Sequence, residues 1–180
     1  MPDSGGTGRR ISADIGRRVA PRRARCGEYA PRAAEMTRAA SESLMPNRLA
    51  DEPLAGDVGI GHTRWATHGI PNEVNAHPHA TSNVALVHNG IIENFKELKA
   101  ELQDRGANFA SETDTEVVVH MISQHLNDGM TPVEAARTTL QQLEGAFALA
   151  VIFSGEHDLM VGARRGSPLV VGFGEDEMFL

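Results

Sequence analysis

Apolar residues recur at helical spacing in three consecutive stretches, residues 94–105, 113–126 and 131–143. In the first, Phe95, Leu98 and Leu102 share one face while Lys and Glu cover the other, and Gly106 suits the position just past the helix end. The second and third stretches each begin with Thr followed three residues later by Glu, which is the pattern of a capping box. The chain is therefore expected to contain three amphipathic helices in a row.

Short apolar runs on either side of these helices predict strands. Residues 58–62 and 83–87 precede the helices, residues 108–110 lie between two of them, and residues 146–153, 159–163, 169–172 and 177–180 follow. Strands apolar on both faces, separated by helices, predict an α+β fold in which helices are layered on sheets. The last run suggests that the sequence stops inside a strand.

Charge divides the chain near residue 50. Residues 1–50 carry ten Arg and five acidic residues, a net of +5, whereas residues 51–180 carry seven basic and nineteen acidic residues, a net of −12. Residues 1–38 also lack Phe, Trp and Leu, so they cannot bury enough apolar surface to order themselves. We expect residues 1–48 to be a basic, disordered segment, or sequence foreign to the fold produced by a shifted reading frame, and residues 49–180 to form the domain.

The overall composition narrows the class of protein. A net charge of −7 argues against nucleic acid or an anionic membrane as the main partner. The single cysteine and the absence of a membrane-spanning apolar run predict a soluble, cytoplasmic protein without disulfides.

Candidate chemistry is concentrated in residues 59–90, which hold five of the eight histidines and the only Trp. Residues 64–82 are rich in Gly, Pro, Asn and His, so we expect an ordered loop between two strands, each ending in polar groups beside glycine. The second strand is expected to stop at His88-Asn89-Gly90, and residues 91–94 to approach a helix. An Asn amide beside a Gly N–H can supply two donors to a developing oxyanion, although an ordinary turn is the alternative.

Two charged residues are further candidates for a ligand site. Arg64 is the only Lys or Arg between Arg48 and Lys96, and its planar fork suits a carboxylate, either of a ligand or of a nearby acid. Asp114 falls in the first turn of a predicted helix, where capping alone would explain a carboxylate. The histidines come with neither paired cysteines nor an H-E-x-x-H helix, so no metal site is predicted, and hydrogen bonding within the loop is preferred.

Four short strings, HTRWATHG, NAHPH, VHNGIIEN and SETDTE, occur in this order along the chain. Together they resemble the glutaminase domain of the glutamine–fructose-6-phosphate aminotransferase (isomerizing) family, a class II glutamine amidotransferase of the N-terminal nucleophile hydrolase type. The resemblance runs from about Leu49 to Leu180. It implies an αββα sandwich, here incomplete because the first strand and a C-terminal part are missing.

The resemblance also implies site roles and partners. Asn89 and Gly90 match the oxyanion hole, Arg64 the group that binds the α-carboxylate of glutamine, and Asp114 the group that binds its α-ammonium. The pocket wall matches Trp65, Thr67 and His68. The family needs no cofactor or metal for this half-reaction, passes ammonia to fructose 6-phosphate in a separate isomerase domain, absent here, and is expected to form homo-oligomers.

The nucleophile departs from the family pattern. The family uses an N-terminal Cys followed by a Gly-Ile-Val-Gly strand, whose thiol attacks the amide. Here the only cysteine, Cys26, is followed by Gly-Glu-Tyr-Ala-Pro, and the family's YRGYDSAG segment is absent. We expect an inactive fragment of the glutaminase domain; the alternatives are a non-catalytic glutamine-binding or regulatory module, or another class II amidotransferase. An open sheet edge would also make the domain marginally stable and prone to aggregate.

Overall fold

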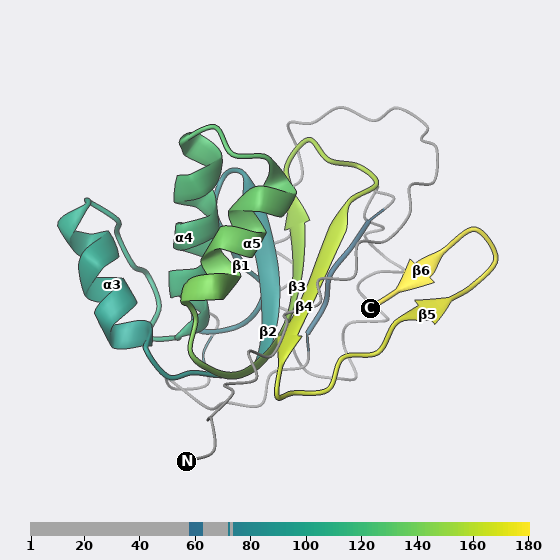
Figure 1. Cartoon of the computed structure of the whole chain (residues 1–180), viewed down its shortest axis with the longest axis horizontal. Helices are drawn as coiled ribbons and strands as arrows, with labels where there is room; N and C mark the ends of the chain where they lie inside the picture. The colour runs from purple at the N-terminus through teal and green to yellow at the C-terminus, as the bar shows by residue number, and fades with distance from the viewer. Residues whose placement is uncertain (1–57, 63–71, 73) are drawn as a thin grey trace, which may run out of the picture.

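A computed structural model describes residues 58–62, 72 and 74–180 (Figure 1). Three consecutive helices lie between the second and third strands, as the hydrophobic pattern predicted. The elements, in chain order, are β1 (His79–Ala80), β2 (Val84–Ile92), α3 (Phe95–Asp104), α4 (Thr115–Asn127), α5 (Pro132–Gln142), β3 (Gly145–Phe153), β4 (Met160–Arg165), β5 (Gly172–Phe173) and β6 (Met178–Phe179).

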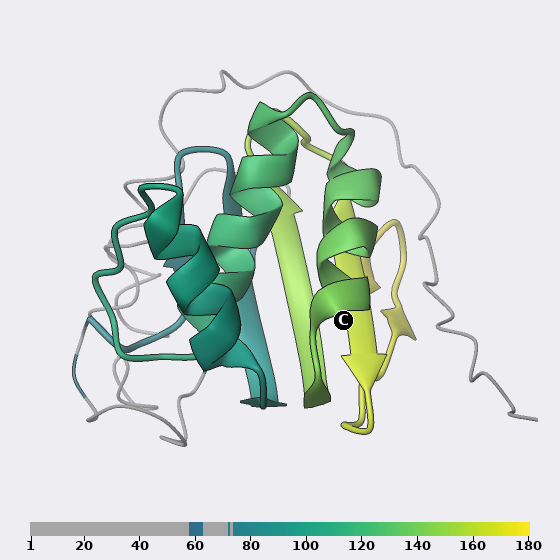
Figure 2. The ribbon, with the colours of Figure 1, turned by 60° about the vertical axis from the view of Figure 1, so that its left-hand side comes forward.

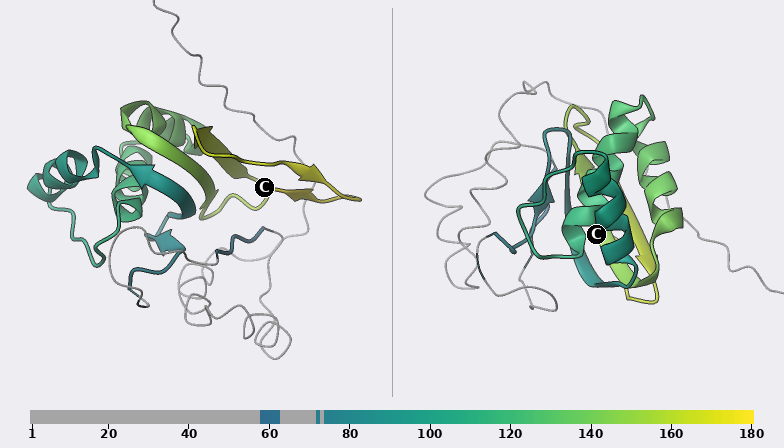
Figure 3. Two further views of the ribbon diagram at one scale, coloured as in Figure 1. Left: turned by 90° about the horizontal axis from the view of Figure 1, so that it is seen from below. Right: turned by 90° about the vertical axis from the view of Figure 1, so that its left-hand side faces the viewer.

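Four strands form one antiparallel sheet in the order β1-β2-β3-β4, and all three helices lie on one of its faces (Figures 1 and 2). The long β2–β3 pair is the centre of the sheet, with Leu86 opposite Val151 and Gly90 opposite Phe147. Because side chains alternate along a strand, every second residue of this pair meets the helices. Seen from below, the helices form one layer and the sheet the next (Figure 3, left).

The core lies between this face of the sheet and α4. The inward face of α4 is formed by Val117, Val118, Met121 and Ile122, all buried as the periodicity predicted, and it packs with Leu86 and Phe147 among others. On either side of α4 lie α3, which contributes Leu98 and Leu102, and α5, which contributes Ala135, Ala136 and Leu140. α4 therefore has a helix on each side and the sheet beneath it.

The helix ends confirm most of the sequence signals. A true capping box starts α5: Thr131 accepts from Glu134 N–H, the Glu134 carboxylate accepts from Thr131 N–H, and Pro132 is the first helical residue. Gly106 follows the end of α3 with φ +90°, as expected for a glycine that ends a helix by adopting the left-handed backbone region. The expected box at Thr113 and Glu116 is absent, however, because both side chains bind groups outside the helix.

Several strand boundaries differ from the prediction. β2 runs on through His88-Asn89-Gly90 to Ile92, so the predicted stop is wrong. Of the residues expected to approach a helix, 91–92 are still in the strand, whereas 93–94 do lead into α3 with Asn94 as its N-cap. Residues 58–62 and 108–110 are not in strands, and the run at 169–172 enters a strand only at Gly172. The strands at 146–153, 159–163 and 177–180 are present within two residues of their predicted bounds.

The described residues have the predicted α+β class: one helical layer, one four-stranded antiparallel sheet and a separate two-stranded hairpin, β5–β6. The hairpin projects beyond β4 (Figure 1), and Leu180 lies against Gly162 of β4, where an added Cβ would come within 2.6 Å of its side chain. Large exposed apolar residues gather along this segment: Val170, Val171, Phe173, Met178, Phe179 and Leu180. Among the described helices, none has the length and apolar character needed to cross a bilayer.

Candidate functional site

Asn89 and Gly90 lie near the end of β2, opposite Ala148 and Phe147 of β3. Gly90 has φ +126°, and a Cβ at this position would lie 2.2 Å from the Ala146 carbonyl oxygen and 2.7 Å from the Phe147 Cα. No side chain fits there, so glycine is required by close approach of two strands and not by a hairpin turn. This is why the Asn-Gly pair, which predicted a turn, sits inside a strand.

The side chain of Asn89 is exposed, whereas the preceding His88 is buried under the helices, as expected from strand alternation. The Asn89 Oδ1 is 2.6 Å from Nε2 of His62. Asn89 therefore presents a polar group on the sheet face away from the helices, at the same end of β2 as Gly90.

Asp114 is buried, with 3% of its surface exposed, and its side chain does not cap α4. Its Oδ2 accepts a hydrogen bond of 2.8 Å from the Ile92 N–H, and its Oδ1 lies 3.8 Å from Nδ1 of His88. The carboxylate thus touches β2 on both sides of the Asn89-Gly90 pair, although it is 24 positions further along the chain than Gly90. Three of the predicted site residues, Asn89, Gly90 and Asp114, are thereby brought to the same end of β2.

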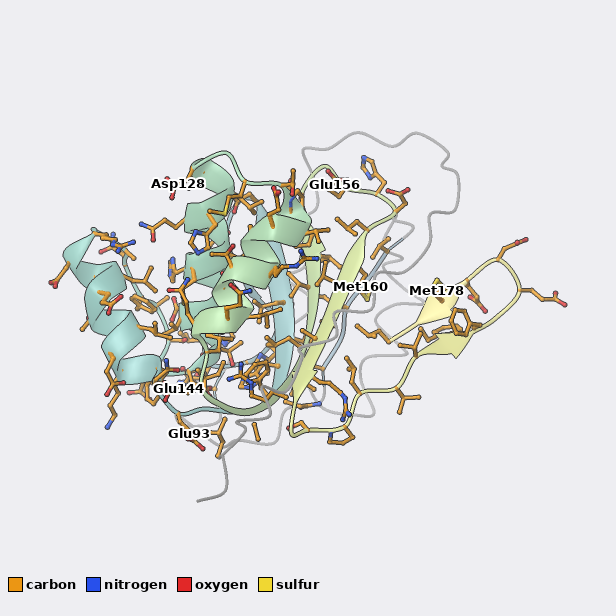
Figure 4. All side chains as sticks on the ribbon, viewed as in Figure 1. Glu93, Asp128, Glu144, Glu156, Met160 and Met178 are labelled. Atoms are coloured by element: carbon orange, nitrogen blue, oxygen red, sulfur yellow. The ribbon has the colours of Figure 1, made fainter. Side chains whose placement is uncertain are left out.

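This end of the sheet is where β2 leads into α3 and where α5 returns into β3. Glu93 and Glu144 mark it in Figure 4, and the Glu93 N–H binds the Glu144 carbonyl at 2.9 Å. Asn94 closes the junction, since its amide donates to the Gln142 carbonyl and its Oδ1 accepts from the Glu144 N–H. These backbone contacts fix the strand end that carries the site residues.

A buried carboxylate, Glu116, holds the segment that leads into Asp114. It accepts hydrogen bonds from the Ala110 N–H, the Ser111 N–H and the Ser111 hydroxyl, at 2.7, 2.7 and 2.5 Å. Burial opposes ionisation of this group, but the hydrogen bonds from His120, Ser111 and Ala110 outweigh it, and the pKa of Glu116 falls from 4.5 to about 2. This role could not be predicted from the sequence, because the same Thr-x-x-Glu pattern forms an ordinary capping box at α5.

Four histidines, which we call the histidine cluster (His62, His77, His79 and His88), connect the two parts of the site. The centroid of the His77 ring lies 4.3 Å from the ring centroid of His62, 5.2 Å from that of His79 and 6.3 Å from that of His88. The residues on either side of Asp114 are each bound by one of these rings: Thr113 Oγ1 is 2.9 Å from His79 Nε2, and Thr115 Oγ1 is 2.9 Å from His88 Nδ1.

The remaining predicted site residues, Arg64, Trp65, Thr67 and His68, and the only cysteine, Cys26, lie outside the described residues. In the described part of the chain no group of three or more His, Cys, Asp or Glu residues is arranged to hold a metal ion. The sequence indicated the histidine cluster only by its density, because the contacts of these rings depend on the folded loop.

Comparisons with known proteins find relatives of this chain among glutamine amidotransferases. A family model described as "Glutamine amidotransferase domain" matches residues 62–179. The chain is 59% identical over 149 residues to a glutamine–fructose-6-phosphate aminotransferase (isomerizing) of Mesorhizobium japonicum, covering 81% of this chain and 24% of that protein. It is 63% identical over 132 residues to the protein of that name from Caulobacter vibrioides, covering 73% of this chain and 22% of the relative.

Among solved structures, the chain is similar to the glutamine phosphoribosylpyrophosphate amidotransferase of B. subtilis, with a TM-score of 0.55 and 30% identity. That match covers 65% of this chain and 26% of the solved chain. The chain thus spans about a quarter of the length of each of these proteins. With a family model matched across all the described elements, the chain belongs to the glutamine amidotransferase domain family.

Proposed function

We propose that this domain binds L-glutamine at the end of β2, with Asp114 receiving the α-ammonium and Asn89 and Gly90 facing the side-chain amide oxygen. Arg64 would pair with the α-carboxylate, and Trp65, Thr67 and His68 would line the pocket. The observation that carries the proposal is the buried Asp114 carboxylate, fixed against β2 beside Asn89-Gly90. A buried carboxylate is a favourable partner for an ammonium group, because a charge removed from water is stabilised by an opposite charge that binds it directly.

The amide end of the ligand would be recognised through two donors. The Asn89 Nδ2 and the Gly90 N–H would both reach the carbonyl oxygen of glutamine, since the absence of a side chain at Gly90 allows close approach. Donors fixed in advance stabilise the negative charge that develops on this oxygen when the amide is attacked.

The names of the relatives indicate which acceptor would receive the ammonia. Proteins about 60% identical over three quarters of this chain bear the name glutamine–fructose-6-phosphate aminotransferase, whereas the similar solved amidotransferase is 30% identical. We therefore favour ammonia supply to fructose 6-phosphate, bound by a separate isomerase domain in a homo-oligomeric cytoplasmic enzyme, over another class II amidotransferase.

For this chain itself we propose binding without hydrolysis. Cys26 is the only cysteine, and the residues after it do not match the apolar strand that follows the family's nucleophile. No other side chain of the sequence matches the family's attacking thiol. An inactive glutaminase fragment and a glutamine-binding regulatory module share this property, and they differ in whether glutamine binds.

We also propose that the complete domain has an αββα sandwich fold, in which a second sheet covers the face of the first sheet that lies opposite the helices. The sheet face opposite the helices carries small or apolar side chains, including Ala85, Val87, Ala148, Ala150 and Ile152. An apolar sheet face of this kind requires a second layer to cover it.

Calorimetric titration of the whole chain with L-glutamine tests the binding proposal. Asp114→Asn keeps an acceptor for the Ile92 N–H but removes the charge, so we expect glutamine affinity to fall at least about tenfold, as for loss of a charged hydrogen bond. Asp128→Asn, an exposed Asp at the other end of α4, is the matched control and should not change it. Absence of glutamine binding by the unmodified, folded chain would contradict the proposal and leave the inactive fragment.

Hydrolysis is measured separately, as ammonia released from glutamine. We expect none from the purified chain. Release that disappears in Cys26→Ala would overturn the proposal that this chain binds without hydrolysing.

A further inference from the structure

We propose that His62 is a positioning residue that sets the orientation of the Asn89 amide, and that the histidine cluster ties this amide to the segment bearing Asp114. This inference rests on the proposed glutamine site and deepens it. An Asn side chain offers two chemically opposite ends, and only its Nδ2 end can donate to the oxygen of a bound amide. A neighbouring group must therefore fix the orientation of the Asn89 amide, so that its Nδ2 end faces the ligand.

The hydrogen bond between His62 and Asn89 fixes this orientation. His62 Nε2 is 2.6 Å from Oδ1 of Asn89, and because Oδ1 can only accept, Nε2 must carry the proton. With Oδ1 occupied by His62, the Nδ2 end is turned the other way. The other ring nitrogen of His62, Nδ1, is buried and has no hydrogen-bond partner among the described residues.

His62 is itself held by a ring contact and not by its second nitrogen. The centroid of its ring lies 4.3 Å from that of the His77 ring, and the two rings make an edge contact at an interplanar angle of 68°. His77 also contacts His79 and His88, whose rings bind the hydroxyls of Thr113 and Thr115. These two threonines flank Asp114, so one cluster braces both the group for the amide oxygen and the group for the ammonium.

Nuclear magnetic resonance of the whole chain tests the tautomer without any mutation. Long-range ¹H–¹⁵N spectra are expected to show His62 protonated on Nε2 and not on Nδ1 at neutral pH. The opposite tautomer would mean that Asn89 donates to His62 with its Nδ2, and it would overturn the proposal. This outcome is independent of whether the chain binds glutamine.

Substitution of His62 tests the consequence for Asn89. In His62→Ala the order parameter of the Asn89 side-chain Nδ2 is expected to fall from a rigid value of about 0.85 to below about 0.6. His62→Gln can still donate to Oδ1 and should restore the rigid value. His157→Ala, in the turn between β3 and β4, is the matched control. An unchanged order parameter in a folded His62→Ala chain would contradict the proposal.

Glutamine affinity gives the functional readout. Loss of one neutral hydrogen bond corresponds to about a fivefold weaker Kd in His62→Ala, with recovery to within about twofold in His62→Gln. If the unmodified chain binds no glutamine, the proposed function fails, and the tautomer and order parameter still decide the role of His62. If glutamine binds and His62→Ala leaves its Kd unchanged, the positioning role fails while the proposed function stands.

Discussion

The starts of α4 and α5 carry the same Thr-x-x-Glu pattern and use it in different ways. At α5, Thr131 and Glu134 bind each other's backbone N–H groups, on the surface and within four residues. At α4, Thr113 binds His79 and Ser111, and Glu116 binds the Ala110 and Ser111 N–H groups. The pattern at α5 stabilises the helix itself, whereas the pattern at α4 stabilises the loop that places Asp114 against β2. A local motif is diverted from its local use where tertiary contacts support a candidate site.

The largest expected difference between the two helix starts is in the two glutamates. Glu116→Ala leaves two N–H groups and a hydroxyl without their acceptor in a buried setting, which should lower the free energy of unfolding by roughly 3 kcal/mol. Glu134→Ala, at a fully exposed position, should cost far less. Urea denaturation of the two variants measures both, and equal losses would remove the distinction.

Acid should separate the same two carboxylates. Because the pKa of Glu116 is about 2 in the folded chain against 4.5 ordinarily, its ionisation stabilises the fold above pH 4.5. That stability is lost as the pH falls from about 4.5 toward 2. Hydrogen bonds from Thr131 also lower the pKa of Glu134, but at an exposed site.

The acid prediction is checked by denaturation at a series of pH values. The gap in stability between the unmodified chain and Glu116→Gln should be widest near neutral pH and narrow across this window. For Glu134→Gln the corresponding gap should stay small throughout. A constant gap for Glu116→Gln would show that its charge contributes nothing.

The threonines should differ less in stability than in function. Thr113→Val removes the hydroxyl bound to His79 and Ser111, at a cost of about 2 kcal/mol for two hydrogen bonds. Thr131→Ala removes a helix cap, at a cost of about 1 kcal/mol. Only Thr113→Val should also weaken glutamine binding, since it loosens the segment before Asp114. Denaturation and calorimetry on the same samples separate the two effects.

The smallest expected effect on stability is that of Asp114→Asn. If Asp114 served α4 as a charged cap, losing the charge would destabilise the helix; its side chain makes no capping bond, and Asn can still accept from the Ile92 N–H. We expect a change in the free energy of unfolding below about 1 kcal/mol, despite the loss of glutamine affinity. A large destabilisation would show that the carboxylate is structural.

The sequence predicted what local chemistry controls. The three helices, the cap of α5, the glycine that ends α3 and the buried strand β3 follow from periodicity and from side chains acting on their own backbone. The motifs also named Asn89, Gly90 and Asp114, which the fold brings to one end of β2.

The failures concern residues whose partners are distant in the chain. The Asn-Gly pair lies within a strand because Gly90 is pressed against β3, 56 positions away at Ala146. Glu116 prefers loop N–H groups to its own helix, and His62 reaches Asn89 across 27 positions. None of these pairings has a local signature, since each depends on how the sheet and the loops are assembled.

The β5–β6 hairpin has a consequence for handling the protein in solution. Phe173 and Val170 expose more than three quarters of their surface, 78% and 77%, and Phe179 exposes 58%. This exposed apolar surface favours association with the same surface on a neighbouring molecule as the protein concentration rises. Light scattering should therefore increase with protein concentration, and fluorescent dyes that seek oily surfaces should brighten on the native chain.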